Sequence, residues 1–301
     1  MGDSTAAPKI EEKAFAKVNL TLEIIGKRRD GYHKLTSVMQ TINLYDNIGL
    51  TLSDDICVTC DDDRIPSVQN LAGKAATILS EQTGTRKGAT IDIRKSIPVS
   101  AGLGGGSADA AATLRGLNKI WELGLSAGEL VEIASDVGSD VPFLVRGGTG
   151  LVQGRGEDVT QIRPARVPRI LILTPGLEST PLDDKTAEVF SHLDQSMYTR
   201  GNLTHKLAAR IRSGSDCPPE FFFNQLEVIA DGVFPQWRND RDLLKSLGAD
   251  EIVLCGSGPS VFTVPPSKEL GTAWQLLLNT VYKKNAFLVS STSEISDVMD
   301  V

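Results

Sequence analysis

The sequence of 301 residues predicts an α+β fold in two lobes. Strand-like segments gather ahead of helical ones in the first half of the chain, whereas a doubly wound parallel sheet would alternate the two regularly. A second series of strands and helices follows the proline-containing segment Arg163–Pro168. We therefore expect one domain over residues 1–165 and another over residues 166–301, each long enough to bury its own core.

Four segments of the first domain have the composition of β-strands. They are rich in apolar and β-branched residues, and they cover residues 13–28, 41–54, 55–62 and 89–97. The sequence Arg-Asp-Gly-Tyr-His over residues 29–33 predicts a turn between the first two strands.

Helical periodicity appears in three segments of the same domain. Residues 68–84 form an amphipathic pattern that ends at a glycine, and a second helix is expected over about residues 107–120. Ser126 and Glu129 have the spacing of a capping box, which predicts a third helix that ends near residue 138.

The charge and hydropathy of the chain exclude several classes of function. A net charge of −7 argues against a nucleic-acid-binding surface. No apolar run approaches the roughly 20 residues that span a bilayer, and the first residues lack the apolar centre of a signal peptide. We expect a cytoplasmic protein with neither nucleic acid nor membrane as a partner.

The four cysteines and three histidines show no metal-site pattern. Cys57 and Cys60 form a C-x-x-C, but no second pair completes a zinc site. The segment that contains them is strand-like, so their thiols would point to opposite faces. We expect free thiols and no metal held by protein ligands.

A glycine-rich loop runs from Pro98 to Ala108 and leads directly into the second predicted helix. Glycines let backbone N–H groups converge on a ligand, and a helix N-terminus adds unpaired N–H groups and about half a positive charge. The combination predicts an anion site, with phosphate as the usual occupant. The alternative is a flexible entry to the helix that binds nothing.

The loop does not match the common phosphate-binding motifs. A P-loop needs G-x-x-x-x-G-K-[ST], which does not occur, and a dinucleotide fingerprint G-x-G-x-x-G is broken at Ser107. The H-R-D and D-F-G strings of protein kinases are also absent from the sequence.

The loop instead resembles the phosphate loop of the GHMP small-molecule kinases, which include galactokinase, homoserine kinase and mevalonate kinase. Residues 14–46, with "AKVNL" and "DGYH", resemble the N-terminal segment of one branch of the family, and residues 254–264 resemble its third glycine motif. The three motifs occur in the family's order across most of the chain. The resemblance implies an N-terminal ATP-binding lobe like domain 2 of ribosomal protein S5, a ferredoxin-like C-terminal lobe on the substrate side, and an active site between them.

The resembled branch phosphorylates the 2-hydroxyl of a methylerythritol carried on cytidine diphosphate, in the non-mevalonate pathway to isoprenoid precursors. The resemblance thus implies ATP as phosphoryl donor, with Mg²⁺ carried by the nucleotide, in a monomer or weak homodimer. The family often has two serines after the glycines, whereas Ala108 follows Ser107 here, so a metal contact from a second serine has no counterpart. The alternatives are a homoserine- or mevalonate-type kinase, or a non-catalytic relative that binds ATP and a metabolite.

Two residues carry the expected chemistry. Asp140 precedes an apolar, strand-like run and matches the family's catalytic aspartate, which would accept the proton of the attacking hydroxyl. Lys17 would keep that carboxylate ionised and polarise the substrate hydroxyl. Asn19 lies two residues on, on the same face of the strand, and would bind substrate. Asp136, in the last turn of a predicted helix, is expected to be a polar surface residue.

The remaining expected contacts divide between two ligands. Backbone N–H groups of the loop would hold the ATP phosphates, and two further side chains would reach the adenosine end. These ATP-binding residues are Pro98, Val99, Ser100, Ala101, Gly102, Leu103, Gly104, Gly105, Gly106, Ser107, Ala108, Asn70 and Lys95. An aromatic pair can hold a base, and a histidine can bind a pyrimidine edge. The residues expected at the substrate are Asn19, Tyr32, His33, Thr186, Phe190, Gly256 and Ser257. For Gly256 and Ser257 the alternative is a tight turn between two strands.

Overall fold

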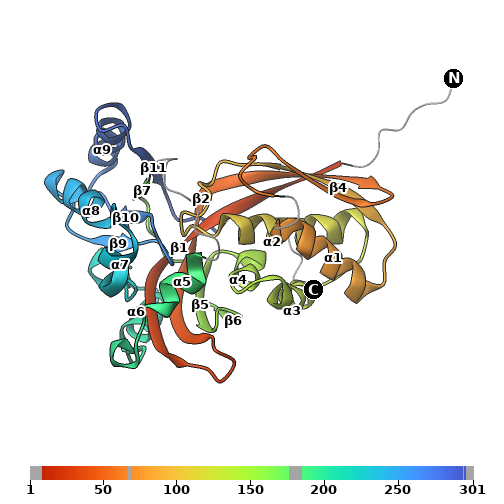
Figure 1. The fold of residues 1–301 in the computed structure, drawn as a ribbon, viewed down its shortest axis with the longest axis horizontal. Coiled ribbons are helices and arrows are strands. Elements are labelled where there is room, and N and C mark those ends of the chain that lie inside the picture. Colours follow the sequence, from red (N-terminus) through yellow and green to blue (C-terminus); the bar gives the residue numbers. More distant parts are fainter. Residues whose placement is uncertain (1–8, 67–69, 176–184, 294, 296–301) are drawn as a thin grey trace.

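The computed structural model describes residues 9–66, 70–175, 185–293 and 295, and it contains two β-sheets with helices packed against them (Figure 1). The first lobe contributes β1 (Lys9–Lys27), β2 (His33–Ser53), β3 (Ile56–Cys60), α1 (Leu71–Thr83), β4 (Gly88–Arg94), α2 (Gly105–Ile120), α3 (Ala127–Val137), α4 (Val141–Arg146), β5 (Thr149–Gly154) and β6 (Asp158–Gln161). The remainder contributes β7 (Ile170–Thr174), α5 (Lys185–Ser191), α6 (Asn202–Arg212), β8 (Phe223–Asn224), α7 (Glu227–Val233), α8 (Trp237–Ser246), β9 (Ile252–Leu254), β10 (Val261–Thr263), α9 (Lys268–Thr280) and β11 (Asn285–Val289), with 3-10 turns at Gln195–Met197 and Pro219–Phe221.

The first sheet is built on a long antiparallel hairpin of β1 and β2. Its strand order is β3-β4-β2-β1-β8, and β5 also pairs with β2 and with β6. Helices α1 to α4 lie together on one side of this sheet in Figure 1. The apolar side chains of α2 and of the facing strands, among them Leu114, Leu117, Ile48 and Ile91, are completely buried. This packing fixes the beginning of α2 relative to β1.

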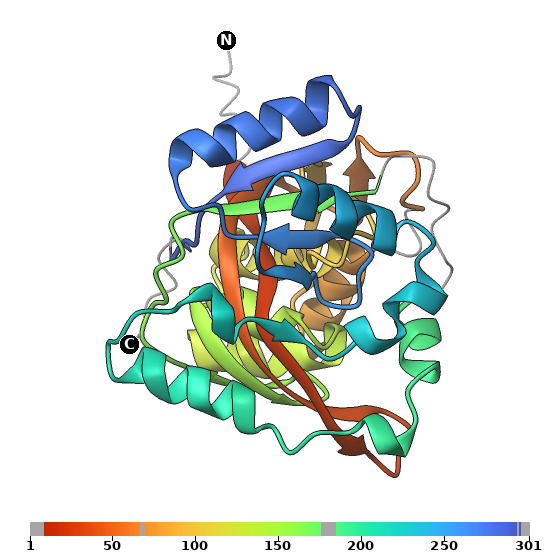
Figure 2. The same cartoon turned by 90° about the vertical axis from the view of Figure 1, so that its left-hand side faces the viewer.

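The second sheet has the order β11-β7-β10-β9 and belongs to the other lobe. Figure 2 shows this lobe facing the viewer, with α9 along β11. The chain crosses back between the lobes, because β8 pairs in parallel with β1 at Thr21–Phe223 and Leu22–Asn224. The predicted α+β class is confirmed, whereas the exact domain boundary at residue 165 stays a prediction.

Strand β1 is irregular where the chemistry was expected. Its pairing with β2 shifts between Phe15 and Lys17 and again between Asn19 and Thr21. Such bulges bend a strand and re-aim its side chains. Strand β2 begins at His33, directly after the predicted turn, although the sequence pattern indicated a strand only from residue 41. Residues 35–40 pair with β1 on one side and β5 on the other and are buried throughout, so they show no alternation of polar and apolar side chains.

Two expectations about local structure are wrong. The apolar run after Asp140 forms the short helix α4, because a brief apolar run has no distinguishing period and Pro142 is well suited to a helix's first turn. The helix expected over about residues 107–120 is α2, but its start was placed too late. The helix begins two residues earlier, with Gly104 as N-cap at φ 74°, a left-handed conformation that favours glycine.

Other local expectations are confirmed. Ser126 and Glu129 form the capping box of α3. Cys57 and Cys60 lie on β3, and both are free. The helix expected over residues 68–84 is α1, although its first two predicted positions lie outside the described residues. Among the described helices, none has the length and apolar character needed to cross a membrane.

Candidate active site

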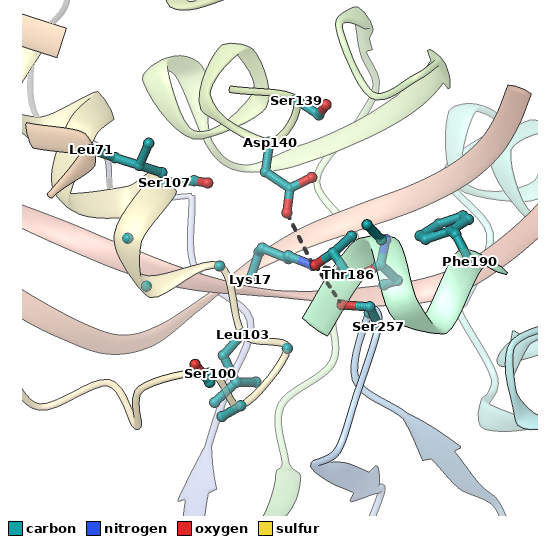
Figure 3. Close-up of a pocket in the computed structure, with 18 of the residues that line it drawn as sticks. Lys17, Leu71, Ser100, Leu103, Ser107, Ser139, Asp140, Thr186, Phe190 and Ser257 are labelled. Atoms are coloured by element: carbon teal, nitrogen blue, oxygen red, sulfur yellow. Dashed lines mark hydrogen bonds and ion pairs between the residues drawn. The ribbon is translucent and has the colours of Figure 1, made fainter. Parts of the chain in front are cut away.

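A cavity of about 860 Å³ lies where the two lobes meet. It runs from the glycine loop past β1 and the start of α4 to α5 and the loop between β9 and β10 (Figure 3). The sequence-predicted residues that line it are Lys17, Asn19, Tyr32, His33, Asn70, Lys95, the loop residues Pro98 to Ser107, Asp140, Thr186, Phe190, Gly256 and Ser257.

Lys17 and Asp140 meet at the centre of the cavity. The Lys17 Nζ lies 3.4 Å from Asp140 Oδ2, a contact marked by a dashed line in Figure 3. The lysine side chain is only 5% exposed, whereas that of Asp140 is 28% exposed and reachable by a ligand. Asp140 is the N-cap residue of α4 but makes no capping hydrogen bond with its side chain, so its carboxylate stays available to the cavity.

A chain of hydrogen bonds fixes the orientation of Lys17. Its Nζ donates to Asn19 Oδ1 at 2.9 Å, and Asn19 Nδ2 donates to Ser37 Oγ at 2.7 Å. The Ser37 hydroxyl in turn donates to the carbonyl of Thr21. Asn19 therefore lines the cavity with its amide engaged by Lys17 and Ser37, and its predicted contact with substrate stays a prediction.

Asp136 differs from Asp140 in every relevant respect. It lies in the last turn of α3, outside the lining of the cavity, and its carboxylate accepts a hydrogen bond of 2.8 Å from Gln82 Nε2. Its position agrees with the expected surface role.

The glycine loop presents the first turn of α2 to the cavity. The first N–H groups of a helix have no partner within the helix, and here they belong to Gly105, Gly106 and Ser107. The N–H of Ala108 instead donates to the Gly104 carbonyl at 2.8 Å, and the Ala108 side chain is buried in the core. Ala108 is therefore the one predicted loop residue that does not line the cavity.

The loop is also bonded to Lys17. The Lys17 N–H donates to the Leu103 carbonyl at 2.9 Å. A Cβ added to Gly104 would lie 3.0 Å from Lys17 Cγ and Cε. Gly104 thus serves both the left-handed start of the helix and the close passage of Lys17.

The loop between β9 and β10 closes the cavity from the other lobe. Gly256 has φ 52°, and a Cβ there would lie 2.8 Å from Lys17 Nζ and from the Gly102 carbonyl. The Ser257 hydroxyl lies 3.3 Å from that of Thr186 on α5. The segment is a turn between two strands, as the alternative reading expected, and it also lies beside Lys17.

Aromatic side chains gather at one end of the cavity. The rings of His33 and Phe190 are 5.2 Å apart, and Tyr198 approaches His33 edge-on at 6.0 Å. Burial, and next the charge of Lys27, lower the pKa of His33, so its imidazole is neutral near pH 7. Its buried Nε2 has no hydrogen-bond partner among the described residues. Tyr32 is 54% exposed at the rim, with the Arg155 guanidinium 5.6 Å from its ring centroid.

The other end of the cavity holds an ion cluster that sequence reasoning found only in part. Lys95 Nζ lies 2.6 Å from both Asp46 Oδ2 and Asp109 Oδ2. Burial raises the pKa of Asp109 to about 7 against the opposing charge of Lys95, and its Oδ1 has no partner among the described residues. Asn70 caps α1 by accepting from the Ala72 N–H. Asp46 and Asp109 were missed because no spacing links either of them to Lys95.

Comparison with known proteins agrees with this geometry. Residues 70–148 match the model of the GHMP kinases N-terminal domain. The chain is 41% identical over 263 residues to a 4-diphosphocytidyl-2-C-methyl-D-erythritol kinase of Brevibacillus brevis, covering 85% of this chain and 87% of that protein. It is 37% identical over 279 residues to a protein of the same name from Dehalococcoides mccartyi, covering 92% and 96% of the two chains.

Solved structures show the same relationship. A 4-(cytidine 5'-diphospho)-2C-methyl-D-erythritol kinase superposes with a TM-score of 0.76 at 26% identity, over 94% of this chain and 99% of that one. A homoserine kinase from Cytophaga hutchinsonii shares the fold, with a TM-score of 0.69 at 18% identity over 97% and 96% of the two chains. This chain belongs to the 4-diphosphocytidyl-2-C-methyl-D-erythritol kinase family of GHMP kinases.

Proposed function

We propose that this protein transfers the γ-phosphoryl group of ATP to the 2-hydroxyl of 4-diphosphocytidyl-2-C-methyl-D-erythritol, a step of the non-mevalonate pathway to isoprenoid precursors. One observation carries the proposal. A single cavity has the Lys17–Asp140 pair at its centre, a glycine-rich helix start on one side and the His33–Phe190 aromatic end on the other.

The reaction needs a nucleophile, a proton acceptor and charge stabilisation. The substrate's 2-hydroxyl oxygen forms a bond to the γ-phosphorus while the bond from that phosphorus to the β-phosphate oxygen breaks, which releases ADP. Asp140 takes the hydroxyl proton. Lys17 lies beside both the carboxylate and the glycine loop, so its charge offsets the charge of the phosphoryl group in transit.

The N–H groups of Gly105, Gly106 and Ser107 would bind the phosphates of ATP, which is a substrate of the reaction. Mg²⁺ would enter with the nucleotide and neutralise part of its charge. The adenosine would extend toward Asn70 and Lys95. Because two carboxylates already share the Lys95 ammonium, that side chain would contribute little further charge to the nucleotide.

The cytosine would lie at the aromatic end. Tyr32 and Phe190 offer ring faces for stacking, and a buried imidazole nitrogen without a partner costs about 1–3 kcal/mol. A base edge that supplies the missing hydrogen bond recovers this cost. Homoserine and mevalonate have no base, so this end of the cavity disfavours the homoserine- and mevalonate-type alternatives. The Lys17–Asp140 contact disfavours a non-catalytic relative.

The test is ADP release from ATP in the presence of each candidate acceptor. We expect release with 4-diphosphocytidyl-2-C-methyl-D-erythritol and only background with homoserine, mevalonate or no acceptor. Release with homoserine or mevalonate would return the assignment to another GHMP kinase. ATP binding without release in any mixture would favour the non-catalytic alternative.

A further inference from the structure

Asn224 is completely buried, and its side-chain amide is hydrogen-bonded to the loop between β9 and β10. It lies at the end of β8, and its Nδ2 donates to the Leu254 carbonyl at 2.8 Å and to the Gly256 carbonyl at 2.7 Å. Its Oδ1 accepts from the Leu226 N–H at 3.0 Å. Both hydrogens of the Asn224 amide are therefore donated to this one loop.

The loop between β9 and β10 contacts Lys17 and the glycine-rich loop. Gly256 passes so close to Lys17 Nζ that a Cβ would lie 2.8 Å away. The backbone of Cys255 packs directly on Gly102, where a Cβ would collide with its carbonyl oxygen. A displacement of the loop would therefore move Lys17 and Gly102 with it.

Asn224 also joins this loop to the strand that carries the lysine. It pairs in parallel with Leu22 on β1, five residues along the strand from Lys17. Glu227, the first residue of α7, also holds the end of β9, because it accepts a hydrogen bond of 3.0 Å from the Leu254 N–H. Asn224 itself does not line the cavity, so it has no route to substrate except through the loop.

We propose that Asn224 is a positioning residue for phosphoryl transfer: its amide bridges the Leu254 and Gly256 carbonyls and thereby sets the placement of Lys17 and the glycine loop across the two lobes. The reaction in this statement is that of the proposed function. Misplacement of reacting groups by about 1 Å can cost about 100-fold in rate. A merely structural amide would instead affect folding stability without a selective effect on turnover.

The decisive variant is Asn224→Asp, and Asn279→Asp is the control for the same exchange at an exposed amide that also binds backbone. The aspartate keeps the size and the acceptor for Leu226, but it loses the amino group, and even a protonated carboxyl has one hydrogen for two carbonyls. Asn279 on α9 is exposed, and both ends of its amide bind the backbone of one residue, since it donates to the Ala286 carbonyl at 3.1 Å and accepts from the Ala286 N–H at 2.8 Å. It lies outside the cavity lining.

We expect Asn224→Asp to lower kcat about 10- to 100-fold, with little change in KM for the cytidine substrate. The affinity for ATP, measured by calorimetry without acceptor, should also weaken, because the loop packs on Gly102. Asn279→Asp should keep both values of the wild type, whatever it does to the melting temperature. Unchanged kcat and ATP affinity in Asn224→Asp, or equal losses in both variants, would overturn the proposal.

Failure to fold and failure of the proposed function can both be told apart from failure of the proposal for Asn224. If Asn224→Asp does not fold, Asn224→Ser removes the amide with a smaller neutral side chain, and the same readouts decide. If the wild type fails to phosphorylate the cytidine substrate, the proposed function fails, whereas the calorimetric comparison still tests the role of Asn224.

Discussion

At the residue scale, Lys17 is held in place at both its side chain and its backbone. Its Nζ is shared between Asn19 and Asp140, and its backbone N–H donates to the Leu103 carbonyl in the glycine-rich loop. A side chain held in this way loses little conformational freedom when substrate arrives. Lys17 and Asp140 were predictable because each lies in a recognisable motif. The contact of Lys95 with Asp46 was not, because only the folded sheet brings those positions together.

Replacement of Asp140 by asparagine keeps the shape of the side chain and removes the proton acceptor. We expect kcat to fall by ~10²–10⁴ with little change in KM for either substrate. The control is Asp136→Asn, because Asp136 contacts Gln82 away from the cavity, and it should keep normal kinetics. Steady-state kinetics checks both variants, and near-normal turnover of Asp140→Asn would remove that carboxylate from the mechanism.

Tyr32→Ala tests the aromatic end. Stacking of a base on an aromatic ring contributes ~1–3 kcal/mol, so KM for the cytidine substrate should rise about 10- to 100-fold while KM for ATP stays unchanged. Tyr282→Ala removes another exposed tyrosine, which follows α9 and does not line the cavity, and it should change neither value. A parallel rise of both KM values in Tyr32→Ala would indicate that Tyr32 only shapes the turn after Asp30.

At the element scale, the sequence predicted that a helix follows the glycine-rich loop but not the residue at which it begins. The glycines indicated an anion site, but the helix was expected from Ser107 and begins at Gly105. The error arises because helix propensity disfavours glycine, whereas here the glycines form the first turn. The run after Asp140 was misjudged for a related reason, since six residues are too few to reveal a helical period.

Gly106→Ala tests whether this helix start binds phosphate. The position is exposed to the cavity, and a Cβ would meet nothing closer than Leu71 Cδ1 at 3.7 Å, so the fold should tolerate it. Gly128→Ala is the matched control, because Gly128 is likewise the second residue of its helix and a Cβ would meet only Ser126 Oγ at 3.8 Å.

Both variants should be as stable as the wild type or up to about 1 kcal/mol more stable. Calorimetry should show ATP binding about 10-fold weaker or worse in Gly106→Ala alone, since the methyl group enters the proposed phosphate site. Wild-type affinity in Gly106→Ala would mean that the glycine loop does not hold the phosphates.

Helix α7 gives the molecule a pH-dependent stability. Burial raises the pKa of Glu227 to about 7, although the Leu254 N–H and Arg241 oppose the shift. Between about pH 4.5 and 7 the folded state therefore keeps a proton that the unfolded state has released, and the stability from this group is lost as pH rises through that window.

Urea unfolding at pH 5 and pH 7.5 checks this effect. A pKa difference of one corresponds to about 1.4 kcal/mol. Between pH 5 and pH 7.5 the free energy of unfolding should therefore fall by about 1–3 kcal/mol less in Glu227→Gln than in the wild type. The pKa of Asp109 is also raised, and Asp109 contributes the same pH dependence of stability to both proteins. Glu132→Gln, at an exposed site on α3, should show the pH dependence of the wild type. If Glu227→Gln also showed the pH dependence of the wild type, the effect would not come from Glu227.

At the scale of the whole molecule, the cavity exists only because the chain crosses between its lobes. Lys17 comes from β1, Asp140 from the start of α4, Phe190 from α5 and Gly256 from the second lobe. The sequence predicted that these residues meet through motifs in a known order. It could not predict that β8 joins the first sheet, because a strand of two residues has no periodicity to detect.

Phosphorus NMR of a reaction with ATP and 4-diphosphocytidyl-2-C-methyl-D-erythritol tests the central claim most directly. The account predicts one new phosphomonoester resonance, an equal amount of ADP, and an intact cytidine diphosphate linkage, with no such product from homoserine or mevalonate. ADP without a new phosphomonoester on the cytidine substrate, or a phosphomonoester formed only on homoserine or mevalonate, would contradict it.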